Sequence, residues 1–162
     1  MKINTKSTLT AAMLTALAVS LSTFAIPIGA SKCFPIQHLC NVIAGVFLGP
    51  GYGVAMAFCT SLIRNLIGTG SPLAFPGSMV GAFLCGFLYQ HTGKLAAAYF
   101  GEVFGTGIIG GLLCYPVATL LMGQEAALFA YVIPFLISTA GGTVMAMILV
   151  GALYQSGAMS YL

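Results

Sequence analysis

Glycine and proline interrupt this chain at five places, and the segments between the breaks are strongly apolar. Gly and Pro are the strongest local signals for the end of a regular element. The breaks cover residues 27–35, 49–53, 68–77, 90–94 and 123–126. They predict six helices, at about residues 7–26, 35–49, 52–67, 77–90, 95–121 and 127–154. The pattern is typical of an all-α protein.

The low charge of the chain indicates which solvent surrounds these helices. Only 4% of the 162 residues are charged and 59% are hydrophobic, whereas soluble domains carry about 25% charged residues. A membrane-spanning helix needs about 20 mostly apolar residues, so the length fits six spans with short connections. The 21 glycines suit close helix packing in lipid. We expect one transmembrane domain over residues 1–162, in a multi-pass protein of a prokaryotic cell membrane.

The positive residues orient the predicted helices. An even number of spans places both termini on one side of the membrane, and Lys and Arg favour the cytoplasmic side. With both termini cytoplasmic, Lys2, Lys6 and Lys94 lie inside, whereas Lys32 and Arg64 lie outside. Three connections then meet at the outer face, those of residues 27–35, 68–77 and 123–126. This arrangement predicts capture of a solute from outside.

The chain lacks the residues that several functional classes of protein need. The chain has only two carboxylates, Glu102 and Glu125, which is too few for a metal-dependent membrane enzyme. No GxxxxGK[ST] motif occurs, so no nucleotide-binding phosphate loop is encoded. The positive residues are scattered and form no basic stripe for nucleic acid. We therefore expect no enzymatic activity, no cofactor and no nucleic-acid partner.

Cysteine and histidine offer one alternative, a metal site. Cys33, His38 and Cys40 supply three candidate zinc ligands, but their spacing matches no common closed zinc site. All five cysteines lie in or beside apolar segments, where a free thiol behaves as a small hydrophobic group. We expect neither a metal nor a disulfide framework.

Glu102 is an ionisable residue inside the fifth predicted helix. Such a residue is costly in a membrane and marks a functional site by default. It either serves ligand or proton binding, or it is protonated or hydrogen-bonded and holds helices together. Helical spacing places Thr106 on the same face. Glycines beside them form two small-xxx-small pairs for close helix contact, Gly101/Gly105 and Gly107/Gly111.

Arg64 and Asn65 lie near the outer end of the third predicted helix. The Arg64 side chain can extend to the membrane interface. Alternatively, it turns inward, bonds carbonyl groups of the 68–77 loop and donates to a ligand. Asn65 points about 100° away on a helix, so only one of the two faces a given site squarely.

A second group of polar residues occurs near the 27–35 connection. Lys32 lies in that connection, and His38 and Asn41 share one face of the second predicted helix. A lone histidine is either a structural hydrogen-bonding residue or a ligand contact. We expect donors for a ligand from His38, Asn41, Arg64 or Asn65, with Lys32 beside them.

Ala12 and Ala16 form a small-residue face near the cytoplasmic end of the first predicted helix. Such a face either packs against a neighbouring helix of the same chain or forms a flat patch for a different membrane protein.

Three stretches resemble the ThiW family: IPIGASKCFPIQHLCNVIAGVFLGPGY, SLIRNLIGTGSPLAFPGSMVGAFLCG and GEVFGTGIIGGLLCYPVA. Members of this family are substrate-binding S components of energy-coupling factor (ECF) transporters, assigned to hydroxyethylthiazole, a thiamin precursor. The resemblance implies a six-helix fold whose pocket is capped by the loops after helices one and three. It also implies association with a membrane scaffold subunit through Ala12 and Ala16, and with two cytoplasmic ATPases.

The resemblance also implies aromatic contacts to the ligand ring. Related vitamin binders stack rings on tryptophan, which this chain lacks, so Phe34, Phe75 and Tyr115 would serve instead. The alternative function is a secondary carrier in which Glu102 couples protons to movement of a small organic solute.

Overall fold

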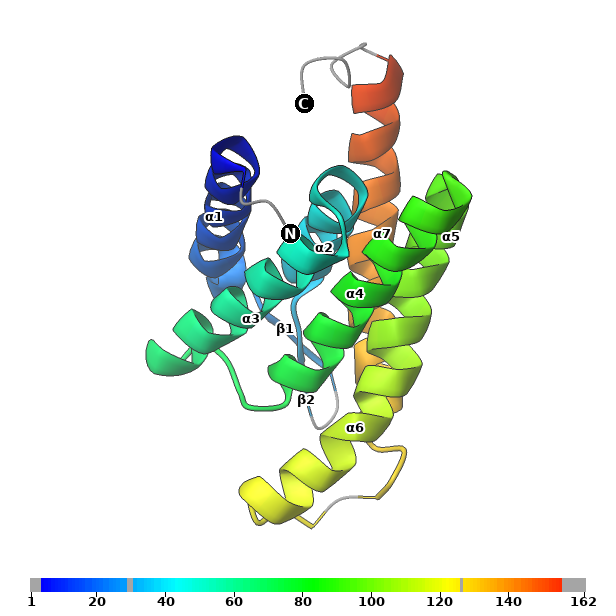
Figure 1. The fold of residues 1–162 in the computed structure, drawn as a ribbon. Coiled ribbons are helices and arrows are strands. Elements are labelled where there is room, and N and C mark those ends of the chain that lie inside the picture. The colour runs from blue at the N-terminus through cyan, green and yellow to red at the C-terminus, as the bar shows by residue number, and fades with distance from the viewer. Residues whose placement is uncertain (1–3, 29–30, 126, 156–162) are drawn as a thin grey trace.

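The computed structural model describes residues 4–28, 31–125 and 127–155 as a helical bundle with one small hairpin (Figure 1). Five of the six helical spans are α1 (Thr5–Ser20), α2 (Pro35–Leu48), α3 (Pro50–Leu66), α4 (Ala74–Thr92) and α7 (Val132–Gln155). The remaining span is continuous over four elements, α5 (Leu95–Glu102), η2 (Val103–Gly110), α6 (Gly111–Pro116) and η3 (Val117–Leu121). The six predicted helices are thus all present.

The connection after α1 differs from the prediction. The first helix was expected to reach residue 26, but α1 ends at Ser20 and a short 3₁₀ turn, η1 (Leu21–Thr23), follows it. The Ser22 hydroxyl donates to the Val19 carbonyl oxygen at 2.6 Å, and such local bonds compete with helix continuation. Strands β1 (Ile26–Ile28) and β2 (Ser31–Cys33) then pair in antiparallel register. The sequence analysis did not predict this hairpin.

The fourth and fifth spans also depart from the expected geometry. Helix α4 begins at Ala74 and not at residue 77. Pro76 therefore lies in its first turn, where the missing N–H has no intrahelical partner to lose. In the fifth span, η2 and η3 are π-helical. The second of these segments follows Pro116, which removes a backbone donor from the helix interior.

Glycines bring the fifth span close to α4 and α7. A Cβ at Gly105 would lie 2.9 Å from the Cα of Gly81 in α4, and a Cβ at Gly111 would lie 2.8 Å from the Cα of Val132 in α7. Gly101 and Gly107 similarly face α4 and α7. The predicted close contacts of the two glycine pairs are confirmed, with one pair serving each neighbouring helix.

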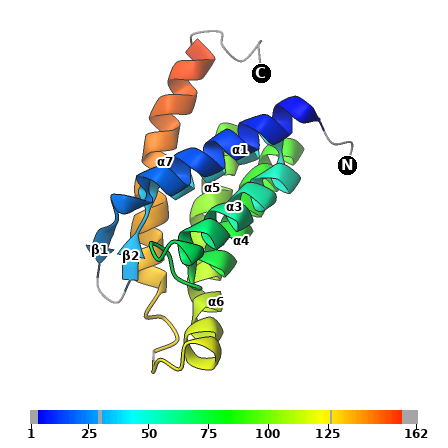
Figure 2. The ribbon, with the colours of Figure 1, turned by 90° about the vertical axis from the view of Figure 1, so that its left-hand side faces the viewer.

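Helices α2 and α4 occupy the middle of the bundle. Helices α1 and α3 pack on one side of them, and the fifth span and α7 pack on the other (Figure 1). The turned view shows α1 running alongside α3, with the hairpin beyond its C-terminal end (Figure 2). At the opposite end of the bundle, tight turns at Gly49 and Gly93 join α2 to α3 and α4 to α5; both glycines have positive φ.

The outer surface of the bundle is apolar. Two helices, Leu95–Leu121 and Val132–Leu153, are long and apolar enough to cross a membrane. Large hydrophobic side chains such as Phe100, Leu120 and Ile148 are exposed on them. Exposed apolar surface of this kind is suited to contact with lipid tails and not with water.

Candidate ligand-binding site

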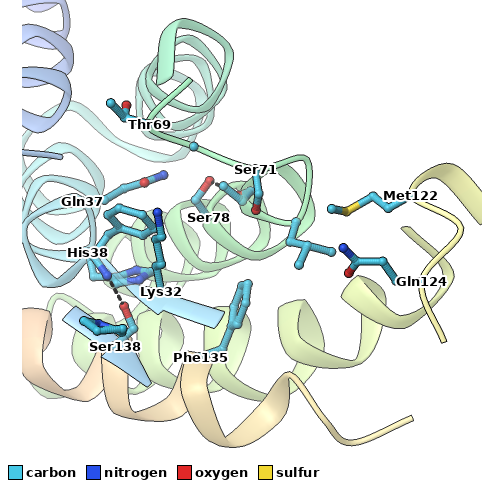
Figure 3. Close-up of a pocket in the computed structure, with 15 residues that line it drawn as sticks. Lys32, Gln37, His38, Thr69, Ser71, Ser78, Met122, Gln124, Phe135 and Ser138 are labelled. Atoms are coloured by element: carbon cyan, nitrogen blue, oxygen red, sulfur yellow. Dashed lines mark hydrogen bonds between the residues drawn. The ribbon is translucent and has the colours of Figure 1, made fainter. Parts of the chain in front are cut away.

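A cavity of about 420 Å³ lies at the hairpin end of the bundle (Figure 3). This volume falls in the range of roughly 300–1,000 Å³ that is usual for small-molecule pockets. Side chains from α2, α4 and α7 form its walls, and residues from three connections close it. The lining residues are Pro27, Lys32, Phe34, Gln37, His38, Thr69, Gly70, Ser71, Leu73, Ala74, Ser78, Met122, Gln124, Phe135 and Ser138.

The three connections that contribute to the cavity are the three that the sequence analysis placed on one face. Lys32 comes from the hairpin, Ser71 from the loop between α3 and α4, and Gln124 from the connection before α7. Their meeting at one end of the bundle is confirmed. Successive helices run in opposite directions, so the first, third and fifth connections all lie at the same end of the bundle.

Asn65 holds the loop between α3 and α4 in place. Its amide nitrogen donates to the Ser61 carbonyl oxygen at 2.7 Å and to the Ser71 carbonyl oxygen at 3.0 Å. The backbone N–H of Gly70 also donates to the Arg64 carbonyl oxygen, at 2.9 Å. Asn65 does not line the cavity, so its contribution to the site is to position the loop that does.

Arg64 turns inward and is fully buried. Its guanidinium carbon lies 3.6 Å from the centre of the Phe34 ring, and its Nη1 donates to Oε1 of Gln37. The interpretation in which this side chain extends to the interface is therefore wrong. Nε and Nη2 have no hydrogen-bond partner within the described ranges. Arg64 stands directly behind two residues of the cavity wall, which suits a positioning role.

Glu102 is also fully buried, and three donors converge on one of its oxygens. Nδ1 of His38 lies 2.9 Å from Oε1, the amide nitrogen of Asn41 lies 3.0 Å from it, and Oγ1 of Thr106 lies 3.2 Å from it. The predicted pairing of Thr106 with Glu102 on one helix face is confirmed. His38 lines the cavity, whereas Asn41 and Glu102 lie behind it.

Polar side chains connect the two buried charges. Gln37 Nε2 donates to Ser61 Oγ at 3.4 Å, and that hydroxyl lies 3.2 Å from Ser78 Oγ. Asn41 Nδ2 donates to the Ser78 carbonyl oxygen at 3.3 Å as well as to Glu102. We call this set the buried polar network; its members are Gln37, His38, Asn41, Ser61, Arg64, Ser78, Glu102 and Thr106.

The aromatic contacts differ from those expected. Phe34 lines the cavity, together with Phe135, which the sequence analysis did not select. Phe75 instead packs against Phe58, with ring centres 5.6 Å apart, and neither Phe75 nor Tyr115 is among the lining residues. Phe75 falls in the first turn of α4 because that helix begins earlier than predicted.

Helix α7 contributes lining residues that sequence reasoning missed. Ser138 lies in the cavity wall, where its hydroxyl accepts a hydrogen bond from the Phe34 backbone N–H at 2.8 Å (Figure 3). The adjacent hydroxyl residues Ser138 and Thr139, in a mostly apolar helix, were the sequence signal that could have indicated this part of the wall. Across residues 4–28, 31–125 and 127–155, no three Cys, His, Asp or Glu side chains are grouped as metal ligands.

An apolar helical bundle that encloses a polar and aromatic cavity defines a membrane protein that handles a small solute. The family model described as "Thiamine-precursor transporter protein (ThiW)" matches residues 8–156, and the chain belongs to this family. The family is one of transporters and not of enzymes. Neither the curated proteins nor the solved structures give a match.

Proposed function

We propose that this chain is the substrate-capture (S) subunit of an ECF-type importer and that it binds hydroxyethylthiazole from outside the cell. The observation that carries the proposal is the cavity at one end of the bundle, which combines aromatic walls with polar groups. A thiazole alcohol is small, neutral and aromatic. It needs apolar walls for its ring and a few well-placed polar partners for its nitrogen and hydroxyl.

The proposed binding mode uses the lining residues. The thiazole ring lies between Phe34 and Phe135, while Lys32 and His38 supply polar contacts. Arg64 holds Phe34 and Gln37 in place from behind. Asn41 and Glu102 support His38, and Asn65 holds the loop that closes the cavity. Phe75 and Tyr115 are not part of this binding mode because they do not line the cavity.

The proposed partner surface is on α1. Ala12 and Ala16 are exposed, whereas Ala11 and Ala18 of the same helix are buried against the bundle. Exposed Met13 lies between the two exposed alanines. This exposure favours a partner surface over packing within the chain for this pair. We propose that a membrane scaffold subunit binds this face and that two cytoplasmic ATPases supply the energy.

Binding by the purified protein tests the capture function. Titration calorimetry of the chain in lipid nanodiscs should show tight, saturable binding of hydroxyethylthiazole without an ion gradient. Thiamin, which joins both rings and carries a permanent positive charge, should bind much more weakly, and the pyrimidine precursor, which has a similar size to the thiazole, tests whether the polar contacts select the thiazole ring. Equal affinity for all three compounds, or no binding of any of them, would contradict the proposal.

A proton-coupled carrier is the second candidate, and one observation favours it. Glu102 contacts His38, which lines the cavity, so a change in protonation of this pair would reach the ligand directly. The chain alone, reconstituted in liposomes, distinguishes the two functions. Accumulation driven by a proton gradient and abolished by Glu102→Gln would establish the carrier. Uptake that requires the scaffold and ATPase subunits would establish the capture subunit.

A further inference from the structure

His38 has its two ring nitrogens in different surroundings. Nδ1 lies 2.9 Å from Oε1 of Glu102, away from the cavity that the same residue lines. The contact with Glu102 occupies Nδ1, which leaves Nε2 as the second ring nitrogen. Nε2 is therefore the atom that His38 offers to a ligand.

The carboxylate of Glu102 limits which nitrogen of a neutral His38 carries the proton. Oε1 already accepts a hydrogen bond from the amide N–H of Asn41, so it acts as an acceptor. A carboxylate oxygen in this role requires a hydrogen on Nδ1. In a neutral imidazole, a hydrogen on Nδ1 leaves Nε2 with a free lone pair. An acceptor at Nε2 requires the neutral imidazole, because both ring nitrogens of the imidazolium are donors.

We propose that Glu102 is a positioning residue that makes Nε2 of His38 a hydrogen-bond acceptor for the hydroxyl group of the ligand. This inference rests on the proposed function and deepens it, because it defines the substrate class. The ligand must present an O–H donor to His38. Side chains that carry donors at the same cavity, Lys32, Ser71 and Ser138, remain for the ring nitrogen.

The thiazole alcohol and its methyl ether are similar in size, but only the alcohol carries the O–H donor that His38 requires. Converting the hydroxyl to a methyl ether keeps the ring and oxygen but removes the donor, so Nε2 loses its partner. A buried acceptor left without a partner weakens binding by roughly tenfold or more. A phosphate ester of the alcohol also loses the hydroxyl donor at this position. The site therefore selects a free alcohol.

Binding by the unaltered protein gives the first test. Calorimetry in nanodiscs compares hydroxyethylthiazole with its methyl ether, and the ether should bind at least about tenfold more weakly. Equal affinities of the alcohol and the ether would overturn the inference while leaving the capture function intact. Failure of both compounds to bind would contradict the capture function, and the spectroscopic test below would then decide the inference by itself.

Nitrogen NMR of the two histidines gives the second test. His38 should show a protonated Nδ1 and an unprotonated Nε2, and exposed His91 in the same chain serves as the internal reference. A protonated Nε2 would overturn the inference. In Glu102→Ala, which removes the acceptor for Nδ1, the fixed protonation pattern should be lost, and the preference for the alcohol over the ether should fall towards one. Glu125→Ala, at an exposed loop residue, is the matched control and should change neither result.

Discussion

Arg64 and Glu102 are both fully buried, yet the regions around them differ in how well they accommodate a charge. Glu102, at the end of α5, faces α2 and α4; the side chains of His38, Asn41 and Thr106 converge on its Oε1, and its Oε2 is unpartnered within the described ranges. Arg64 lies near the cavity rim with one hydrogen bond and one aromatic ring, and its Nε and Nη2 are unpartnered within the described ranges. The comparison indicates that Glu102 supports the bundle as well as the site, whereas Arg64 supports the site alone.

Removal of Glu102 should have the largest effect. Glu102→Ala leaves the donors of His38, Asn41 and Thr106 without their shared acceptor. Hydrogen bonds to a charged group each contribute about 1.5–3 kcal/mol, so the unfolding free energy should fall by about 3 kcal/mol or more. Thermal unfolding in detergent should show this loss, and exposed Glu125→Ala is the control. If Glu102→Ala left the unfolding free energy unchanged, the proposed difference between the two buried charges would be contradicted.

Removal of Arg64 should affect binding more than stability. Arg64→Ala removes a buried cation with two unpartnered N–H groups, so the lost contacts are offset by a relieved desolvation cost. We expect a change of about 1 kcal/mol or less in unfolding free energy. Affinity should fall roughly tenfold, because Phe34 and Gln37 lose their support.

Arg64→Lys tests the geometry of that support. Lysine keeps the charge but lacks the planar group that stacks on Phe34, so it should not restore affinity. Calorimetry and thermal unfolding measure the two quantities on the same samples. A stability loss in Arg64→Ala as large as that of Glu102→Ala would contradict the comparison.

Removal of Asn65 should have a smaller effect, confined to the loop between α3 and α4 that closes the cavity. Asn65→Ala deletes the two bonds to the Ser61 and Ser71 carbonyl oxygens, at a cost of about 1 kcal/mol for each net bond. Hydrogen exchange of the amides at residues 68–71 should speed up, and ligand dissociation should become a few-fold faster. Leu66→Ala, at an exposed neighbouring residue, should change neither rate. Equal exchange in both variants would mean that the loop is held by other contacts.

Substitutions on α1 should leave both charged regions unchanged. Ala16→Leu adds a side chain to an exposed position, so affinity and unfolding temperature should stay constant, whereas uptake with the complete transporter should be lost. Ala18→Leu is the contrasting variant, because Ala18 is buried and overpacking costs about 1–3 kcal/mol. Normal uptake by Ala16→Leu would show that the scaffold subunit binds elsewhere.

Features set by chain polarity and local breaks were predictable from the sequence. The breaks at Gly49 and Gly93 coincide with turns that require positive φ, and the glycine pairs at 101/105 and 107/111 indicated close helix contacts. The 26–33 hairpin was not predictable, because two strands of three residues are not stable alone and depend on packing of β2 against α7. Phe135 and Ser138 were missed for the same reason, since their exposure to the cavity depends on how α7 packs.

Gly81 leads to an expectation about which residues vary together in homologous sequences. A Cβ at this position would collide with Oγ1 of Thr106 and would lie 2.9 Å from Oε2 of Glu102. The room for a buried acid in one helix is thus created by a missing side chain in another. In chains of this architecture, loss of the glycine should accompany loss of the acid. This linked pair is a test that an alignment of homologous sequences can perform without any protein being made.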